Sequence, residues 1–470
     1  MRAHEAGWAH AVVSVRGPAW LREPGDTNDL VPRLWSTTAR KADGVLKVGG
    51  VPLPDLVAEH GSPAYVLDEE DFRARARAFR DGFAGWQVYY AGKAFLCTAV
   101  ARWIDEEGLS LDVCTGGELA VAERAGFPMD RVEFHGNNKS PAELERAVRL
   151  GVGRIVVDSF HEIDRLIALV APGSGSSVAG RTVRVLVRVT AGVEAHTHEY
   201  IATAHEDQKF GFSISSGDAF EAVRQLQDAP GVELQGLHSH IGSQIFDSSG
   251  FEVAARRVLA LHARIADELG RELPELDLGG GFGIAYTTQD DPSDAAQLAT
   301  EMTKIVRDEC ATRGLAVPRL SIEPGRAIAG PAVCTVYEVG TVKPVELDGG
   351  AVRTYVSVDG GMSDNIRTAL YDADYSCTLA NRHSEAPPLL TRVVGKHCEA
   401  GDIVVKDEFL PGDLLPGDLL AVPGTGAYCR SMASNYNHAL RPPVVVVRDG
   451  GSRVVVRRET LDDLLATDLG

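Results

Sequence analysis

Eight short runs of apolar, largely β-branched residues recur between residues 86 and 325, and this repetition limits the possible folds more than any other feature of the chain. Most runs are followed by a helix-like amphipathic stretch. Strands that alternate with helices form parallel sheets, and eight units in about 240 residues match the size of a (β/α)8 barrel. We therefore predict a barrel, with a doubly wound open sheet as the alternative. The runs are Val88–Tyr90, Leu111–Val113, Val132–Phe134, Ile155–Val157, Val183–Val189, Leu234–His240, Leu276–Leu278 and Leu320–Ile322.

Local signals support this organisation. Ser140 followed by Pro141 predicts the start of a helix over residues 141–150. After residue 331 the chain changes to strand-like runs with tight turns, and Asp-Gly-Gly at 348–350 and 449–451 predicts two hairpins. The predicted fold class is α/β, a TIM-type barrel plus a mainly antiparallel β domain. The predicted domains are an N-terminal arm (1–45), the barrel (69–331) and the β domain (46–68 and 332–470).

Charge and cysteine usage exclude several classes of protein. With 47 Lys and Arg against 66 Asp and Glu, the net charge is −19, which repels nucleic acid and anionic lipid surfaces. No apolar stretch approaches the length of a membrane span, and the N-terminus lacks a signal-peptide pattern, so we predict a cytoplasmic protein without a membrane or nucleic-acid partner. The seven cysteines are scattered without CxxC pairs, as expected of reduced thiols.

The ends of the predicted strands carry the chemistry. Catalytic groups of barrel enzymes gather at the C-terminal ends of strands, and phosphate often binds after strands 7 and 8. Here those strands end in the glycine run 279–281 and in Glu323-Pro324-Gly325-Arg326, which suit an anion, although tight turns also use glycine. Lys93 follows the first strand. A lysine beside a phosphate site and an acidic residue is what Schiff-base chemistry with pyridoxal phosphate requires.

Two histidine groups raise the question of a metal. His238 and His240 share one face of a strand, so they could be metal ligands, core histidines or a ring stacked on a cofactor. The second group is His196, His198, Glu199 and His205. Because neither group has cysteine partners or HExxH spacing, we expect no metal.

Ten motifs together resemble the alanine racemase-like, fold-type III pyridoxal phosphate decarboxylases. They are YAGKAF, LDVCTGGEL, FHGNNKS, EAHTHEYIATAHEDQKFGFS, HSHIGSQ, DLGGGFG, EPGRAI, DGGMSDNIRTALY, GKHCEAGD and GAYCRSMASNYN. The resemblance covers about residues 45–465 and is strongest to the members that act on meso-2,6-diaminopimelate. EPGR and HIGS (residues 240–243) are shared with ornithine and arginine decarboxylases, whereas GKHCEAGD and GMSDNIRTALY point more narrowly.

The resemblance implies a pyridoxal 5'-phosphate cofactor. Lys93 would form the internal aldimine, His240 would stack on the pyridine ring, and Glu323 would hold the ring nitrogen protonated. The remaining cofactor-binding residues would be Ser243, Gly280, Gly281, Gly325, Arg326 and Tyr428.

The resemblance also implies a substrate site shared within a homodimer. Cys398, as proton donor to Cα, and Glu399 would come from the neighbouring subunit, in a motif that has Ala400 where serine is common. The expected substrate-binding residues are Arg326, Arg367, Tyr371, Glu399 and Tyr428, and the expected products are L-lysine and CO2. An arginine on the departing carboxylate would stabilise the ground state, so these arginines should bind a distal carboxylate.

Three alternatives differ in class. A basic amino acid decarboxylase would act on ornithine, arginine or lysine. A catalytically inactive relative would be expected to lose the lysine or the proton donor, yet Lys93, Glu323 and Cys398 are all present. A racemase usually carries a tyrosine as its second acid/base, and the cysteine motif argues against it.

Overall fold

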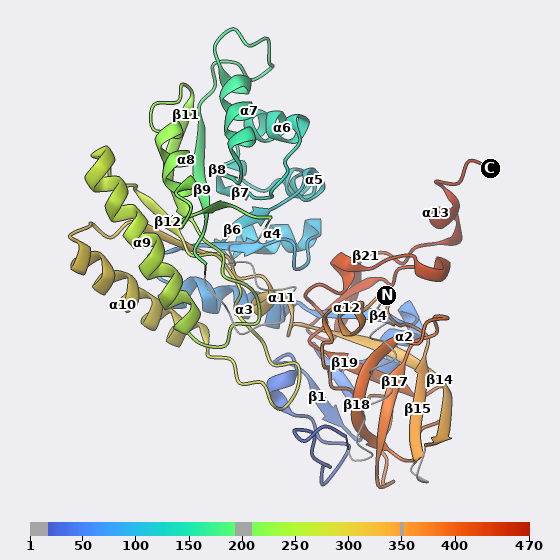
Figure 1. The fold of residues 1–470 in the computed structure, drawn as a ribbon. Helices are drawn as coiled ribbons and strands as arrows, with labels where there is room; N and C mark the ends of the chain where they lie inside the picture. Colours follow the sequence, from blue (N-terminus) through green and yellow to red (C-terminus); the bar gives the residue numbers. More distant parts are fainter. Residues whose placement is uncertain (1–16, 193–208, 348–351) are drawn as a thin grey trace. The chain divides into compact units, whose positions relative to one another are not determined.

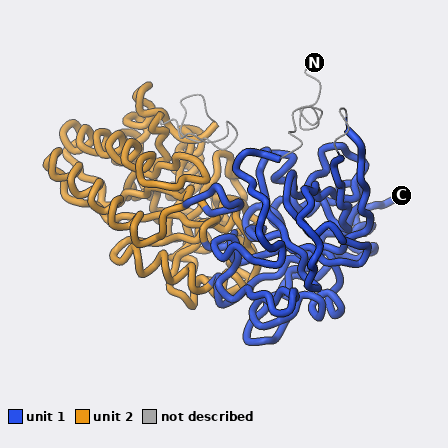
Figure 2. The backbone as a smooth tube through the Cα atoms, turned by 90° about the horizontal axis from the view of Figure 1, so that it is seen from below, with its two compact units in different colours: residues 1–72, 284–291, 328–470 blue, residues 73–283, 292–327 orange. Residues whose placement is uncertain are grey.

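The computed structural model describes residues 17–192, 209–347 and 352–470 and divides the chain into two compact units. Unit 1 comprises residues 1–72, 284–291 and 328–470, and unit 2 comprises 73–283 and 292–327 (Figure 2). The domain boundaries expected from the sequence remain a prediction.

Unit 2 is built on a closed barrel of eight parallel strands. Each strand pairs with the next, β13 pairs with β5, and β8 pairs with β9, so the sheet has no open edge and the doubly wound alternative is wrong. All eight predicted runs contain a strand, although β11 ends at His238, two residues before the predicted end, and β12 ends at Asp277, one residue before it. The strands are β5 (Gln87–Ala91), β6 (Ser110–Val113), β7 (Val132–Phe134), β8 (Arg154–Val157), β9 (Val183–Thr190), β11 (Val232–His238), β12 (Glu275–Asp277) and β13 (Arg319–Ile322), with short β10 (Phe212–Ser213) beside β9.

Helices lie around the outside of the barrel strands (Figure 1). They are α4 (Thr98–Glu106), α5 (Gly116–Ala125), α6 (Pro141–Leu150), α7 (Phe160–Val170), α8 (Asp218–Leu226), α9 (Ser249–Leu269) and α10 (Ala295–Arg313); α3 (Glu69–Gly82) precedes β5 and α11 (Arg326–Ala329) follows β13. Helix α6 begins where Ser140 predicts. Its Ser140 hydroxyl accepts from the Glu143 N–H while the Glu143 carboxylate accepts from the Ser140 N–H, so the helix is capped reciprocally.

Unit 1 contains a mostly antiparallel sheet, as the sequence predicts. Its strand order is β18-β17-β15-β14-β4-β20-β21, and only the β15–β17 and β4–β20 pairs are parallel along that path. The strands are β4 (Ala64–Asp68), β14 (Val333–Glu346), β15 (Val352–Val358), β17 (Pro388–Val394), β18 (Ile403–Pro411), β20 (Val444–Arg448) and β21 (Gly451–Val456), with β16 (Thr378–Leu379) and β19 (Leu419–Pro423) paired beside β14.

Smaller elements complete unit 1. The N-terminal strands β1 (Arg40–Ala42), β2 (Val45–Val48) and β3 (Val51–Pro52) form a separate sheet. The helices are α2 (Leu53–His60), α12 (Arg367–Tyr371) and α13 (Leu461–Leu465). Leu34, Trp35 and Ala39, from the segment predicted as an arm, pack in the hydrophobic core of this unit.

The hairpin predicted at 449–451 is confirmed. Strands β20 and β21 pair with Arg448 opposite Gly451, so Asp449 and Gly450 form a two-residue turn, and both have positive φ, +51° and +78°. Positive φ at both positions defines a type I′ turn, whose twist matches that of the strands. The hairpin predicted at 348–350 lies outside the described residues.

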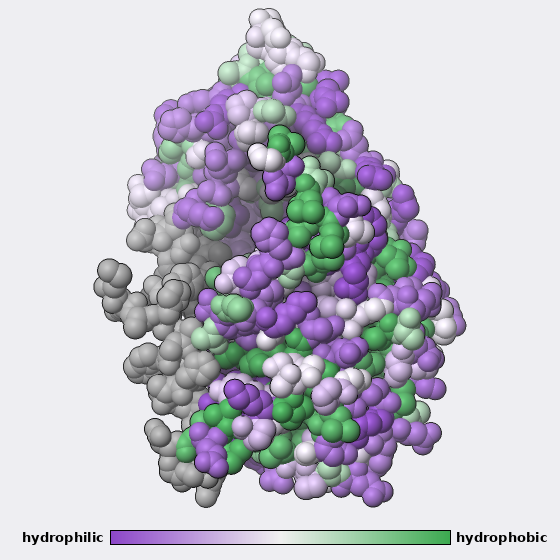
Figure 3. Space-filling view, turned by 90° about the vertical axis from the view of Figure 1, so that its right-hand side faces the viewer, coloured by the Kyte–Doolittle hydropathy of each residue, from purple (hydrophilic) through white to green (hydrophobic). Residues whose placement is uncertain are grey.

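On the face shown in Figure 3, hydrophobic residues form small groups that hydrophilic residues separate. Within the part of the chain that the structure describes, no helix combines the length and apolarity needed to cross a bilayer.

Candidate active site

Lys93 lies just after β5 at the C-terminal end of the barrel and is half-buried. The backbone around it is fixed on both sides. The Gly92 N–H donates to the Asp112 carbonyl at 2.9 Å, and Gly325 approaches so closely that a Cβ there would lie 2.9 Å from the Ala91 carbonyl oxygen. The backbones of the loops after β5 and β13 therefore pack directly against each other, and this close approach leaves no room for a side chain at position 325.

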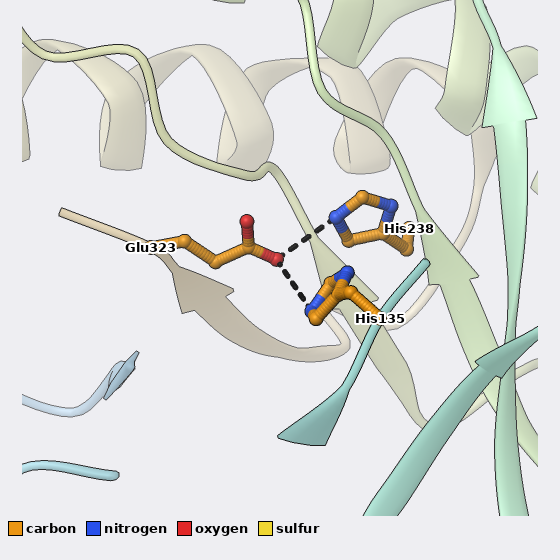
Figure 4. Close-up of side chains that lie close together, drawn as sticks. All are labelled: His135, His238 and Glu323. Atoms are coloured by element: carbon orange, nitrogen blue, oxygen red, sulfur yellow. Dashed lines mark hydrogen bonds and ion pairs between the residues drawn. The ribbon is translucent and has the colours of Figure 1, made fainter. Parts of the chain in front are cut away.

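Glu323, directly after β13, lies between two histidines (Figure 4). Its Oε1 is 2.9 Å from Nε2 of His238 and 3.2 Å from Nε2 of His135. The imidazole rings meet edge to face with centroids 4.8 Å apart. Glu323 is 3% exposed, His238 0% and His135 5%, so the interaction is shielded from water. A buried carboxylate with two such partners stays ionised.

The charges of these three groups follow from their surroundings. Burial would raise the pKa of Glu323, but the two histidines outweigh burial and hold that pKa well below its usual range. Burial would lower the pKa of His135, yet Asp112 and Glu323 raise it. Burial lowers the pKa of His238 to about 4. His135 therefore holds a second proton more readily than His238, which is neutral at neutral pH.

Three more acidic side chains lie behind Glu323 inside the barrel. Asp112, Glu133 and Asp277 come from β6, β7 and β12, and each is at most 3% exposed. Burial raises the pKa of Asp112 to about 6 and that of Asp277 to about 8, and burial together with Asp277 and Glu323 raises the pKa of Glu133 well above its usual value. Burial therefore favours the protonated form of Glu133 and of Asp277.

The glycine run after β12 packs tightly against neighbouring loops. A Cβ on Gly280 would lie 2.2 Å from the Glu323 carbonyl oxygen, and one on Gly281 would lie 2.5 Å from that of Gly242. The Gly280 N–H donates to Nδ1 of His240 at 3.2 Å. This bond fixes the orientation of the His240 ring, whose pKa burial and the nearby Lys93 hold well below its usual value.

Arg326 and Ser243, predicted near a phosphate, lie together. Nη2 of Arg326 donates to the Ser243 hydroxyl at 2.7 Å, and Arg326 is buried. A guanidinium beside a hydroxyl and glycine-rich backbone is a donor set that suits a phosphate group.

Two groups of side chains among the described residues could hold a metal ion. The ligand atoms of His135, His238 and Glu323 lie within 4.8 Å of one another, as do those of Glu133, Asp277 and Glu323. In the first group, the hydrogen bond from His238 and the ion pair with His135 explain why the side chains lie close to Glu323 without a metal. In the second group, protonation of Glu133 and Asp277 would allow the three carboxyl groups to lie close together. The cluster formed by His196, His198, Glu199 and His205 lies outside the described residues.

In unit 1, Arg367 begins helix α12 and is 5% exposed. Its Nη1 donates to the Tyr375 hydroxyl at 2.6 Å, and its guanidinium lies 4.5 Å from the ring centre of Tyr286. Burial would lower the pKa of Arg367, but these two tyrosines and Cys429 raise it, so the group is a cation. Nε of Arg367 has no hydrogen-bond partner among the described residues.

Cys398 and Glu399 lie exposed on a turn of unit 1. The buried carboxylate of Asp402 shapes this turn by accepting from the N–H groups of Met362, at 2.6 Å, and His397, at 2.8 Å. Tyr428 and Tyr371 are half-buried, and Tyr428 has a φ of +63°, a conformation that non-glycine residues adopt rarely. Strained backbone of this kind is enriched at functional sites.

Sequence reasoning did not single out His135, Asp112, Glu133 or Asp277. The available signal was an acidic residue at the centre of an otherwise apolar strand, as in Leu111-Asp112-Val113, Val132-Glu133-Phe134 and Leu276-Asp277-Leu278. Such a residue is costly to bury unless it has a partner or takes up a proton.

The residues of unit 2 suit pyridoxal phosphate. Lys93 supplies an amine, Glu323 a buried anion for the pyridine nitrogen, His240 a flat ring of fixed orientation, and Arg326 with Ser243 an anion site. Ser239 lies between His238 and His240 in the sequence, and its buried Oγ has no hydrogen-bond partner among the described residues. This hydroxyl can therefore still form a hydrogen bond with a bound group.

The family comparison agrees with this donor set. Residues 69–330 match the family described as "Pyridoxal-dependent decarboxylase, pyridoxal binding domain". The barrel and its donor set thus define a pyridoxal phosphate-dependent carboxy-lyase.

Known relatives narrow the class. The diaminopimelate decarboxylase of Mycobacterium tuberculosis is 56% identical over 446 residues, which are 94% of this chain and 98% of that protein. The one from Mycobacterium leprae is 53% identical over 477 residues and covers 100% of both. A crystal structure of diaminopimelate decarboxylase from M. jannaschii with L-lysine has a TM-score of 0.84 at 28% identity, covering 93% of this chain and 98% of that one. The chain belongs to the diaminopimelate decarboxylase family of lysine biosynthesis.

Proposed function

We propose that this chain converts meso-2,6-diaminopimelate to L-lysine and CO2. The observation that carries the choice of substrate is Arg367, a buried guanidinium with no carboxylate partner among the described residues. A buried cation without a counter-ion is costly, and a carboxylate of the substrate would neutralise it. Names of the relatives at 53–56% identity point to the same substrate.

When bound, pyridoxal phosphate supplies an electron sink for the electron pair left at Cα as CO2 departs. Lys93 would bind its aldehyde carbon and Glu323 its ring nitrogen, while His240 would pack against the ring. Ser243, Gly280, Gly281, Gly325, Arg326 and Tyr428 would complete the cofactor site. An ionised Glu323 favours a protonated ring nitrogen, because opposite charges stabilise each other in a buried site.

Substrate recognition follows from the charge change in the reaction. The carboxylate that leaves must not be stabilised by a cation, so Arg326 and Arg367 would bind the carboxylate at the far end, with Tyr371 and Tyr428 beside it. Glu399 would accept from the distal ammonium. Ornithine and lysine lack the distal carboxylate and would leave the Arg367 guanidinium without a counter-ion.

We propose that Cys398 donates the proton that replaces CO2 at Cα. Its thiol is exposed on the turn that Asp402 shapes, and so is the carboxylate of Glu399. Exposed reactive groups on a rigid turn are suited to completing the site of a second copy of the chain, so the proposed active unit is a homodimer with shared active sites.

The test is to incubate the purified holoenzyme with meso-diaminopimelate, ornithine, arginine or lysine, to measure CO2 release and to identify the product. We expect L-lysine from meso-diaminopimelate and turnover of the other three lower by about a thousandfold or more, because each leaves a buried polar group without its partner. Comparable turnover of ornithine, arginine or lysine would contradict the proposal and favour a basic amino acid decarboxylase.

A further inference from the structure

We propose that His135 and His238 are positioning residues that together hold the Glu323 carboxylate ionised and oriented toward the pyridine nitrogen of the cofactor. This inference rests on the proposed role of Glu323 and concerns residues that the sequence reasoning did not assign to that role.

The two histidines contact the same oxygen of Glu323, and we call this arrangement the histidine clamp. Both imidazole Nε2 atoms face Oε1 of Glu323, at 2.9 Å from His238 and 3.2 Å from His135 (Figure 4). The three side chains leave the ends of three different strands, β11, β7 and β13. Because each is anchored to a separate strand of a closed barrel, the carboxylate has little freedom to rotate.

The two histidines differ in their charges. His135 has three carboxyl groups near its Nε2: Glu323 at 3.2 Å, and Asp112 and Glu133 at 3.7 Å each. This environment supports an imidazolium. His238 is fully buried, its Nδ1 has no hydrogen-bond partner among the described residues, and burial lowers its pKa to about 4. His238 is therefore a neutral donor, with its proton on Nε2.

The positions of Glu133 and Asp277 beside the histidine clamp favour the protonated form of both acids. Glu133 and Asp277 lie with Glu323 in a group whose carboxylate oxygens are within 4.8 Å of one another, and three ionised carboxylates at that distance would repel strongly. Both carboxyl oxygens of Glu133 are buried without a hydrogen bond among the described residues, which accords with a neutral acid. Among these three carboxyl groups, the negative charge is thus held by Glu323.

Further charged and titratable groups act on this cluster from the surrounding elements. Tyr89 on β5, Lys93 after β5, Arg154 on β8 and Arg188 on β9 all interact electrostatically with members of the cluster. The ion pair closest to Glu323 remains that with His135.

The loop after His135 is itself held rigidly. Lys139 is buried, and its Nζ donates at 2.7 Å to each of three oxygens, the Gly136 carbonyl, the Val156 carbonyl and the Glu162 carboxylate. This anchor ties the segment carrying His135 to β8 and α7. The backbone segment that follows His135 is therefore held in place.

A cofactor analogue without the ring nitrogen can distinguish a role in positioning Glu323 from a role in folding alone. We propose to measure the affinity of the apoenzyme for pyridoxal phosphate and for its 1-deaza analogue, in which carbon replaces the ring nitrogen, in wild type, His135→Gln, His238→Gln and His238→Leu. Wild type should prefer pyridoxal phosphate by about tenfold or more, and His135→Gln should lose about tenfold of that preference, because it removes the ion pair with Glu323. His238→Gln, which can still donate, should retain more of the preference than His238→Leu.

His262→Gln is the matched control, because His262 is a buried histidine of α9 whose Nε2 accepts from the Leu273 N–H. It should leave the preference unchanged. Equal weakening of both cofactors in His135→Gln would overturn the inference while leaving the proposed function intact. If wild type itself showed no preference, the role of Glu323 and the inference would both fall.

A second measurement does not need the cofactor. Carbon-13 NMR of labelled histidine in the apoenzyme at pH 7 should show an imidazolium resonance that disappears in His135→Gln and titrates at lower pH in Glu323→Gln. A neutral His135 at pH 7 would overturn the inference.

Discussion

Arg367 is the residue whose burial and lack of a carboxylate partner among the described residues most strongly favour the proposed substrate. Replacing it with methionine removes the cation but keeps an apolar chain in the pocket beside Tyr286 and Tyr375. We expect kcat/KM for meso-diaminopimelate to fall by about a hundredfold, the range for a charge-assisted pair, with cofactor affinity nearly unchanged.

Arg392→Met is the control for this variant. Arg392 is equally buried in unit 1, but its Nε donates to the Lys406 carbonyl and its guanidinium lies 3.6 Å from Asp407. It should lower stability without changing substrate selectivity. A loss of cofactor binding in Arg367→Met as large as the loss of substrate use would count against the assignment.

Lys93 is the residue expected to bind the cofactor covalently. Borohydride reduction of the holoenzyme followed by peptide mapping should place the pyridoxyl group on the peptide that contains Lys93, and Lys93→Arg should abolish labelling. Lys139, a buried lysine of the same unit, should stay unlabelled because its Nζ already donates to three oxygens. A label on Lys139 would disprove the assignment.

Asp277 should control how stability depends on pH. Its folded pKa of about 8 lies above its ordinary value of 3.8, so the folded state holds a proton that the unfolded state releases. The contribution of Asp277 to stability is therefore fully present below about pH 4 and is lost as pH rises through about 8. In Asp277→Asn the apparent unfolding temperature should decline less between pH 5 and 8 than in wild type, by a few degrees.

Thermal unfolding of both apoproteins across that range measures the effect. The side-chain amide introduced by Asp277→Asn can still accept from the Gly279 N–H, so most of the local bonding is kept. Identical pH profiles for the two proteins would mean that Asp277 is ionised in the folded state.

At the scale of elements, the loops after β12 and β13 act as one packed layer. Gly280→Ala would put a Cβ 2.2 Å from the Glu323 carbonyl oxygen, which belongs to backbone and cannot rotate away. We expect a loss of about 1–3 kcal/mol in stability and weaker cofactor binding, because the glycine run or the backbone of Glu323 must shift.

Gly314→Ala serves as the comparison for Gly280→Ala. Gly314 ends helix α10 with φ +68°, and a Cβ there would meet nothing within 4 Å. It should cost about 1 kcal/mol through backbone strain alone and leave cofactor affinity unchanged. Unfolding curves and cofactor titrations of both variants test whether the two substitutions differ in stability and in cofactor affinity. Unaltered cofactor binding in Gly280→Ala would contradict the expected role of this packing in the cofactor site.

At the scale of the whole molecule, the proposed shared sites predict complementation. Lys93→Ala and Cys398→Ala should each be inactive. After subunit exchange, half of the dimers would be hybrids, each with one intact site, so about a quarter of wild-type activity should return. No recovery, with exchange verified by tagged subunits, would show that each chain completes its own site.

The sequence by itself determined the elements and the identity of the principal chemical groups. Eight apolar runs predicted the eight barrel strands, Ser140 and Pro141 predicted the start of α6, and Asp449-Gly450 predicted a tight hairpin. These features depend on local backbone preferences, which residues within a few positions determine. The motifs around Lys93 and Glu323 likewise carried the family and the cofactor.

Only the tertiary structure decided the electrostatics of the site. Asp112, Glu133, His135, Asp277 and Glu323 are spread over more than 200 positions, and barrel closure alone makes them neighbours. Which acids are protonated and which histidine is charged depends on distances of 3–4 Å and on exclusion of water, and neither is encoded in any short stretch of sequence. The same holds for the buried Arg367, whose solvation and partners come from Tyr286 and Tyr375 in other segments.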